Sequence, residues 1–270
     1  MKRIICLFSL FIMLMPLAFA AKATPAWEYP IDPLILEDAP GFLVLTNKST
    51  LLDPSFIPGD LVSVSLKRAN ACQLRKPVHD ALEEMFNAAK EVGYTLYVKS
   101  AYRSYQTQNT MYYNRLERMG YDDGLVAYPG SSDHQTGMGI DVLNYEWMQK
   151  DGMNYRFAEE AEAQWMAAHC HEFGFVIRYL KDKEDVTGID YEPWHLRYVG
   201  VEVATYMMEN YLTLEEFTQE WQSYVAQFEA AGGDFKAYCK ELKALPPAVE
   251  TGEYGADGDS EISLFYSHNN

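Results

Sequence analysis

The spacing of apolar positions along the chain predicts a series of helices separated by short strands. Over 77–92, apolar residues recur every three or four positions, which is the period of a helix that buries one face. Pro77 suits the first turn of this helix, and Gly93 ends it. Similar periods or matching start and stop signals predict further helices over 104–119, 158–173, 200–210 and 213–230.

Short runs rich in β-branched and aromatic residues predict strands between these helices. They lie at 41–46, 61–64, 94–99, 140–143, 175–178 and 194–198. The mixed order of helices and strands predicts an α+β domain with a small, mostly antiparallel sheet flanked by helices. The long segment 121–139, rich in Gly, Asp and Ser, is expected to be a loop, and loops of this length in a compact domain are usually functional.

Length and composition set the domain boundaries. The chain has 270 residues, 48% of them hydrophobic, which is enough for one well-packed core. We assign this domain to residues 41–230. Residues 21–40, rich in Pro, Ala and acidic residues, are expected to form an extended leader. Residues 231–270 are expected to be an acidic C-terminal extension, in which 262–266 could form an edge strand or an arm.

The N-terminus has the features of a secretory signal peptide. Lys2 and Arg3 precede an apolar run over 4–20, and the small residues at the end of the run suit cleavage after Ala20. An uncleaved membrane anchor is the alternative, because the run approaches the ~18 residues that can span a bilayer. With residues 1–20 removed as a signal peptide, we expect no membrane span and a secreted or extracytoplasmic location.

The formal net charge of −17 excludes some classes of partner. A chain this acidic repels the phosphates of nucleic acids, and no basic stripe interrupts the acidity. Three cysteines, Cys72, Cys170 and Cys239, remain after the predicted signal peptide, so at most one disulfide can form beside a free thiol. Because no Cys-x-x-Cys occurs, a zinc knuckle built from thiolates is also excluded.

Two short segments hold the residue types that bind a catalytic metal ion. His134 and Asp141 lie in one Gly-rich stretch, and His195 follows Glu192 by three positions. Two imidazoles and one carboxylate are a usual ligand set for one catalytic Zn²⁺, and the additional Glu could act as the general base. Arg103, at the end of a predicted strand, could bind a substrate carboxylate or an oxyanion. Taken singly, each residue also has an ordinary explanation, such as a turn-capping Asp or a surface salt bridge.

Three segments resemble, in the right order, the signatures of the VanY-type D-alanyl-D-alanine carboxypeptidases. They are Ser-Ala-Tyr-Arg-Ser-Tyr-Gln-Thr-Gln at 100–108, Ser-Asp-His-Gln-Thr-Gly-Met-Gly-Ile-Asp at 132–141, and Glu-Pro-Trp-His-Leu-Arg-Tyr-Val-Gly at 192–200. That family consists of zinc peptidases of bacterial cell walls and is related to the VanX dipeptidases and the LdcB-type L,D-carboxypeptidases. The resemblance covers about residues 42–210 and implies the small α+β fold shared with the hedgehog signalling domain.

The resemblance also implies roles for individual residues. It implies that His134, Asp141 and His195 bind one zinc ion, that Glu192 is the catalytic base, that Arg103 binds or polarises the substrate, and that Ser132 and Gln108 line the substrate pocket. The family pattern usually has Ala where this chain has Gly139, which is a small loss of bulk beside the metal-binding strand.

These roles predict a secreted zinc carboxypeptidase that hydrolyses the terminal D-Ala-D-Ala bond of peptidoglycan stem peptides at the bacterial cell wall. Three alternatives remain open. They are an L,D-carboxypeptidase that acts on tetrapeptide stems, an endopeptidase that cuts cross-links, and a non-catalytic, zinc-containing binding module. The presence of Glu192 favours an enzyme over a binding module, because binding alone needs no general base.

Overall fold

The computed structural model describes residues 24–245. The predicted signal peptide and the segment 262–266, for which a strand or an arm is expected, lie outside the described residues. Within 24–245, no helix has both the length and the apolar character needed to cross a membrane. The same part of the chain holds Cys72, Cys170 and Cys239 as free thiols, so the single disulfide that the sequence would allow is not formed among them.

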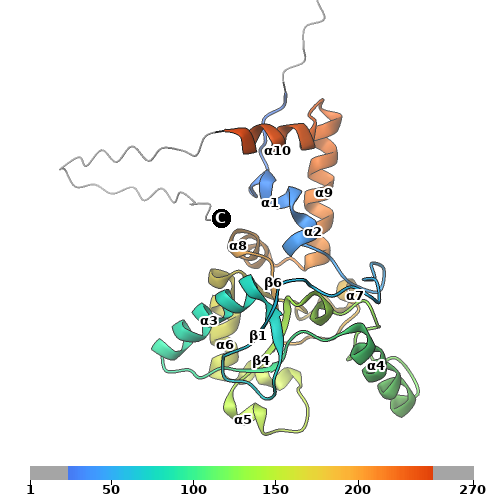
Figure 1. Ribbon diagram of the computed structural model, residues 1–270, viewed down its shortest axis with the longest axis vertical. Helices are drawn as coiled ribbons and strands as arrows, with labels where there is room; N and C mark the ends of the chain where they lie inside the picture. The colour runs from blue at the N-terminus through green and yellow to red at the C-terminus, as the bar shows by residue number, and fades with distance from the viewer. Residues whose placement is uncertain (1–23, 246–270) are drawn as a thin grey trace, which may run out of the picture.

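A four-stranded antiparallel sheet forms the centre of the fold (Figure 1). Its strands, in spatial order, are β3 (Tyr97–Ser100), β4 (Gly139–Leu143), β6 (His195–Tyr198) and β5 (Phe175–Ile177). A separate two-stranded sheet pairs β1 (Leu61–Ser63) with β2 (Gln73–Arg75). This small antiparallel sheet with surrounding helices confirms the predicted α+β class.

Helix α3 (Lys76–Glu91) packs into the core with the apolar face that its period predicts. Pro77 occupies the first turn, where a backbone N–H would have no partner within the helix. Leu82 and Met85 are fully buried in one cluster with Ile140 of the central strand. The other elements around the sheet are α4 (Tyr105–Met119), α5 (Tyr145–Met148), α6 (Ala161–His169), α7 (Glu184–Thr187) and the 3-10 turns η1 (Asp133–Thr136), η2 (Tyr155–Glu159) and η3 (Cys170–Phe173).

A group of helices at the two ends of the described chain forms a second packing unit. We call residues 24–42 together with 201–245 the helical cap. It contains α1 (Pro33–Glu37), α2 (Ala39–Phe42), α8 (Val201–Glu209), α9 (Leu214–Ala230) and α10 (Phe235–Ala244). In Figure 1, α9 extends away from the sheet and α10 lies beside α1 at the far end. The cap has its own buried cluster, which includes Leu36, Phe217 and Phe228.

The N-terminal part of the chain differs from expectation in two places. Residues 21–40 are not extended throughout their described part, because Asp32 caps α1 by accepting a hydrogen bond from the Leu34 backbone N–H at 2.8 Å, and Leu36 is buried in the cap. Residues 41–46 do not form the predicted strand. The carbonyl oxygens of Phe42 and Val44 instead accept hydrogen bonds from the Arg197 guanidinium, at 3.1 and 2.7 Å.

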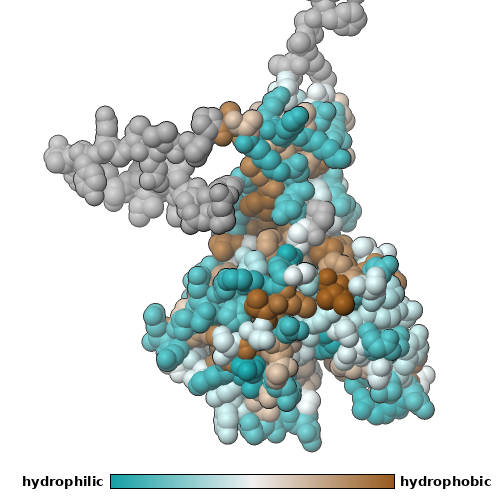
Figure 2. Space-filling view, in the orientation of Figure 1, coloured by the Kyte–Doolittle hydropathy of each residue, from teal (hydrophilic) through white to brown (hydrophobic). Residues whose placement is uncertain are grey.

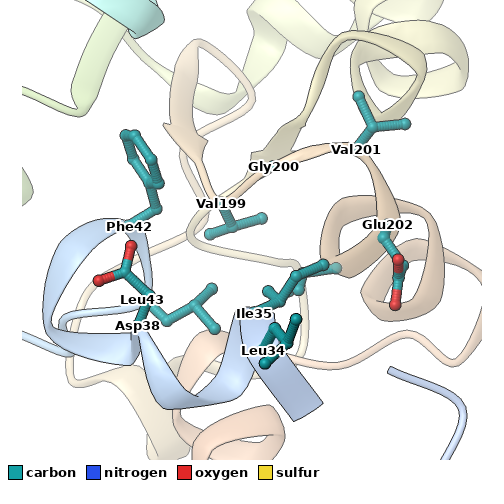
Figure 3. Close-up of a pocket in the computed structure, with 10 residues that line it drawn as sticks. Leu34, Ile35, Asp38, Phe42, Leu43, Val199, Gly200, Val201 and Glu202 are labelled. Atoms are coloured by element: carbon teal, nitrogen blue, oxygen red, sulfur yellow. The ribbon is translucent and has the colours of Figure 1, made fainter. Parts of the chain in front are cut away.

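An apolar groove of about 350 Å³ lies between α1 and α2 and the start of α8. Figure 3 shows Leu34 and Leu43 below Val199, with the carboxylates of Asp38 and Glu202 beside them. Figure 2 shows hydrophobic residues exposed where the helical cap meets the rest of the molecule. The groove shares no lining residue with the histidine pocket described below, so it is a separate feature of the cap.

Candidate metal centre and active site

The register of the sheet brings the predicted metal ligands together. Asp141 lies in the central strand β4, directly opposite His195 in β6 and opposite Ser100 at the end of β3. His134 comes from η1, which ends at Gly137 with φ of 69° before the chain enters β4. Glycine adopts this left-handed conformation without steric cost, so the Gly-rich stretch of the sequence makes the tight turn. Residues distant in sequence thereby share one site.

Three side chains converge closely enough to hold one metal ion. One ligand atom each from His134, Asp141 and His195 lies within 4.8 Å of the other two. His134 Nε2 is 3.3 Å from Asp141 Oδ2, and His195 Nδ1 is 3.0 Å from Asp141 Oδ1. All three residues are buried, with exposed fractions of 3–4%. Two imidazole nitrogens and a carboxylate oxygen form the donor set that suits a catalytic zinc ion.

A hydrogen bond to the backbone leaves the lone pair of His134 facing this centre. His134 Nδ1 lies 2.7 Å from the carbonyl oxygen of Ala101. Because a carbonyl oxygen can only accept, Nδ1 carries the proton and donates a hydrogen bond to it. Burial, assisted by the charge of Arg103, lowers the pKa of His134 and keeps the ring neutral. Nε2 is then an acceptor that faces a second acceptor, Asp141 Oδ2. Two acceptors in contact need a cation between them, which fits a bound metal ion.

Glu192 reaches the same centre from the turn that precedes β6. Its Oε2 lies 3.6 Å from His195 Nδ1, and the His195 backbone N–H donates to the Glu192 carbonyl oxygen at 3.1 Å. The pKa of Glu192 is raised well above its ordinary value, mainly by burial and to a smaller extent by the negative charge of the nearby Asp141 carboxylate. Burial would also raise the pKa of Asp141, but that pKa is held low, and the contact of His195 Nδ1 with Asp141 Oδ1 is one of the interactions that stabilise the carboxylate. One carboxyl is therefore kept ionised while the other can hold a proton, which is the division that acid–base catalysis uses.

Arg103 stands beside Asp141, with Nη2 4.0 Å from Asp141 Oδ2. Its guanidinium is fixed by two hydrogen bonds, because Nη1 donates to Gln108 Oε1 at 2.8 Å and Nη2 donates to Ser100 Oγ at 3.0 Å. Gln108 Nε2 in turn donates to the carbonyl oxygen of Ala127 at 2.7 Å. Both ends of the Gln108 amide are thus engaged with the protein, so this side chain orients Arg103 and holds the 127 loop.

A pocket of about 150 Å³ opens at this centre. Every residue predicted to act in the site borders it, including Ser132, which is 3% exposed. No role was predicted for the other lining residues, which are Met111, Leu125, Val126, Ala127, Met153, Tyr179, Ile189 and Trp194. Residues 125–127 belong to the long loop that was predicted to be functional. Met153 gave no signal, because a single Met in sequence cannot be told from any buried apolar residue.

Gly139 makes room for the metal-binding turn. A Cβ at this position would lie 2.8 Å from the carbonyl carbon and Cβ of Asp133 and 3.0 Å from the His134 nitrogen. The Ala of the family pattern therefore has no space in this chain, and we expect Gly139→Ala to lower the free energy of unfolding by about 1–3 kcal/mol. Denaturant titration measures this loss. Gly59→Ala is the control, because a Cβ at Gly59 meets nothing within 4 Å; an equal loss in both variants would contradict the steric explanation.

Comparisons with known proteins agree with this geometry. Residues 71–201 match the family model described as VanY, D-alanyl-D-alanine carboxypeptidase. The chain is 38% identical over 194 residues to the Bacillus subtilis (strain 168) protein named "Putative carboxypeptidase YodJ", and the match covers 68% of this chain and 70% of the relative. The matched range contains all the residues that form the candidate metal centre.

Two solved structures are similar to the fold. The structure of the LdcB LD-carboxypeptidase superposes with a TM-score of 0.61 at 39% identity, covering 65% of this chain and 84% of that one. A mutant of the vancomycin resistance D,D-pentapeptidase VanY from the VanB-type cassette, in complex with Zn(II), superposes with a TM-score of 0.54 at 28% identity, covering 66% and 98%. With the sequence matches, these likenesses show that the chain belongs to the VanY family of D-alanyl-D-alanine carboxypeptidases.

Proposed function

We propose that the protein is a secreted, zinc-dependent carboxypeptidase that removes the terminal D-alanine from peptidoglycan stem peptides. The observation that carries this proposal is the convergence of His134, Asp141 and His195, with Glu192 3.6 Å from one of them. The Zn(II) complex of the VanY relative and the D,D-pentapeptidase activity in its name support the same metal and reaction. The apolar run after Lys2 and Arg3 supports export to the cell wall, where stem peptides occur.

The residues present fit one zinc ion, with His134 Nε2, His195 Nδ1 and a carboxylate oxygen of Asp141 as its protein ligands. A bound Zn²⁺ supplies Lewis acidity, which lowers the pKa of water and polarises a carbonyl. The pocket that borders the three residues leaves space for water and substrate, which suits a catalytic site rather than a closed structural one.

The side chains of this protein then divide the remaining chemistry. Glu192 Oε2 accepts the proton of the attacking water and returns it to the amine of the departing D-alanine. Arg103 is held by Gln108 and Ser100 with its charge directed at the pocket, where it binds the terminal carboxylate or the oxyanion of the tetrahedral intermediate. Recognition of a free carboxylate makes the reaction exopeptidic.

A second candidate, an L,D-carboxypeptidase acting on tetrapeptide stems, has its own support. The LdcB LD-carboxypeptidase superposes with a higher TM-score and identity than the VanY structure does, 0.61 against 0.54 and 39% against 28%. Both activities use the same zinc and carboxylates. They differ in the residue that precedes the cleaved bond, so substrate length separates them.

The test is incubation of the purified protein with pentapeptide and tetrapeptide stems, followed by mass spectrometry of the products. We expect loss of one D-alanine from the pentapeptide, abolished by a chelator and restored by Zn²⁺. Cleavage of the tetrapeptide alone would favour the L,D activity. Release of a dipeptide or larger fragment, or activity that survives complete chelation, would contradict the zinc carboxypeptidase.

A further inference from the structure

Three charged side chains lie buried next to the metal-binding turn, and a fourth, partly exposed one completes their cluster. Asp133, Arg178 and Arg197 are each at most 2% exposed, and Glu215 of α9, whose side chain is 12% exposed, pairs with Arg178. Burying charges costs free energy unless they are paired and hydrogen-bonded. Two carboxylates against two guanidinium groups leave this cluster neutral. The chemistry described above uses none of the four residues, so their burial calls for another role.

Asp133 is held from two directions. Arg178 Nε donates to Asp133 Oδ2 at 2.8 Å, and Arg197 Nη1 donates to Asp133 Oδ1. Arg178 also donates from both terminal nitrogens to the Glu215 carboxylate, at 2.8 and 2.7 Å. Arg197 lies two residues after His195 in β6, so the two side chains share one face of the strand. The cluster therefore ties η1, the sheet and α9 together.

The backbone extends this support to the active-site residues. Asp133 directly precedes His134, and the His134 carbonyl oxygen accepts a hydrogen bond from the Arg103 backbone N–H at 3.0 Å. The Arg178 backbone N–H donates to the carbonyl oxygen of His195, also at 3.0 Å. A displacement of the Asp133 side chain would thus shift one metal ligand and the arginine of the pocket together, because they are joined through the same turn.

We propose that Asp133 is a positioning residue for the metal centre and that the helical cap supports it through Glu215. The inference rests on the proposed zinc site. Helix α9 lies beyond residues 71–201, which match the family model, so this carboxylate comes from outside the matched segment. Glu215 holds the outer part of the Arg178 guanidinium and thereby fixes the nitrogen that binds Asp133. The cap is then part of the support of the site.

The proposal predicts a graded loss of metal affinity. Asp133→Asn keeps the size of the side chain and removes its charge, and we expect it to weaken Zn²⁺ binding by about 10–100-fold, the usual effect of losing an outer-shell partner. Glu215→Gln should weaken binding less, because it acts through Arg178. Competition with a chelating dye measures the affinity on the folded full chain.

Hydrogen exchange in the metal-free protein provides a second measurement. The backbone N–H groups of Arg103 and Gly137 both donate to the His134 carbonyl oxygen, at 3.0 and 3.3 Å. In Asp133→Asn they should exchange faster than in the wild type, while the amides of β4 keep their protection. A uniform loss of protection in η1 and β4 would mean that Asp133 only stabilises the fold, and would overturn the positioning role.

Glu220→Gln is the matched control. Glu220 lies on the same helix as Glu215 but accepts hydrogen bonds from the hydroxyls of Tyr29 and Tyr206 within the cap, so Zn²⁺ affinity should not change. Unchanged affinity in Asp133→Asn and Glu215→Gln, or an equal loss in Glu220→Gln, would overturn the inference alone. If Asp133→Asn does not fold, the Zn²⁺ affinities of Glu215→Gln and Glu220→Gln still test the inference, because only Glu215→Gln should bind more weakly. A wild-type protein without Zn²⁺ affinity would overturn the proposed function as well.

Discussion

Replacing Glu192 with Gln is expected to lower kcat for D-alanine release by about 10²–10⁴-fold, the usual contribution of a general base. The amide has nearly the shape of the carboxylate but cannot accept and return a proton. Glu192 is almost wholly buried, and its burial raises the pKa of the carboxyl, so the group is suited to hold a proton between the two transfers. Zn²⁺ affinity should change little, since Glu192 lies outside the three-residue ligand set.

Release of D-alanine from a pentapeptide stem, measured with saturating Zn²⁺, gives kcat and KM for this variant. The control is Glu146→Gln, the same chemical change on the exposed surface of α5, where the Glu146 side chain is 68% exposed and pairs with Lys150. It should leave kcat unchanged. A Glu192→Gln enzyme with wild-type kcat would remove the general-base role, and a variant that lost Zn²⁺ as well would show that Glu192 is a ligand instead.

The candidate metal-site residues could be selected from the sequence because their types carry the chemistry, and the structure brings three of them together. A His and an Asp in a Gly-rich stretch, with a Glu shortly before a second His that begins a later strand, together indicate a metal site. Their meeting in space depends on the pairing of β4 with β6, where Asp141 faces His195. The periodicity of the strands does not give the order in which they pair in the sheet. Only the structure therefore shows that these side chains converge.

The buried arginines show why other features could not be predicted. An arginine in an acidic chain is expected at the surface, yet Arg178 and Arg197 are almost completely buried. Their partners come from η1, α9 and the segment around 42–46, which are distant in sequence. The strand predicted at 41–46 was wrong for the same reason. Its composition favours a strand, but the Val44 carbonyl oxygen accepts a hydrogen bond from Arg197, a residue distant in sequence.

The prediction that residues 21–40 are extended was wrong for a related reason. Its Pro and acidic residues favour an extended segment by composition, whereas a few apolar residues decide its structure. Ile31 and Leu36 are each 2% exposed in the core of the helical cap. Their burial partners lie in the C-terminal helices, some 170–200 residues away along the chain, for example Val203 and Phe228. Local pattern cannot report a contact of that separation, which is set by the whole fold.

Substitution of Asp141 by Asn should abolish both Zn²⁺ binding and activity, in contrast to Glu192→Gln. Asp141 is the residue that contacts both histidines, at 3.3 Å to His134 Nε2 and 3.0 Å to His195 Nδ1. Asn provides no anionic ligand. Its amide N–H₂ can also donate a hydrogen bond to His134 Nε2 and thereby occupy the lone pair that would bind the metal. We expect Zn²⁺ affinity to fall by more than about 100-fold, beyond the range for outer-shell residues.

The same reasoning predicts that the metal-free Asp141→Asn protein stays folded, because the new amide can satisfy the two imidazoles that the carboxylate contacted. Chelator competition measures the affinity, and thermal unfolding without metal measures the stability. Asp151→Asn, on the exposed surface, is the control and should change neither. If Asp141→Asn bound Zn²⁺ as tightly as the wild type, Asp141 would not be a ligand. The metal would then have to lie elsewhere in the pocket, because the two histidines alone leave too few protein ligands for a catalytic zinc site.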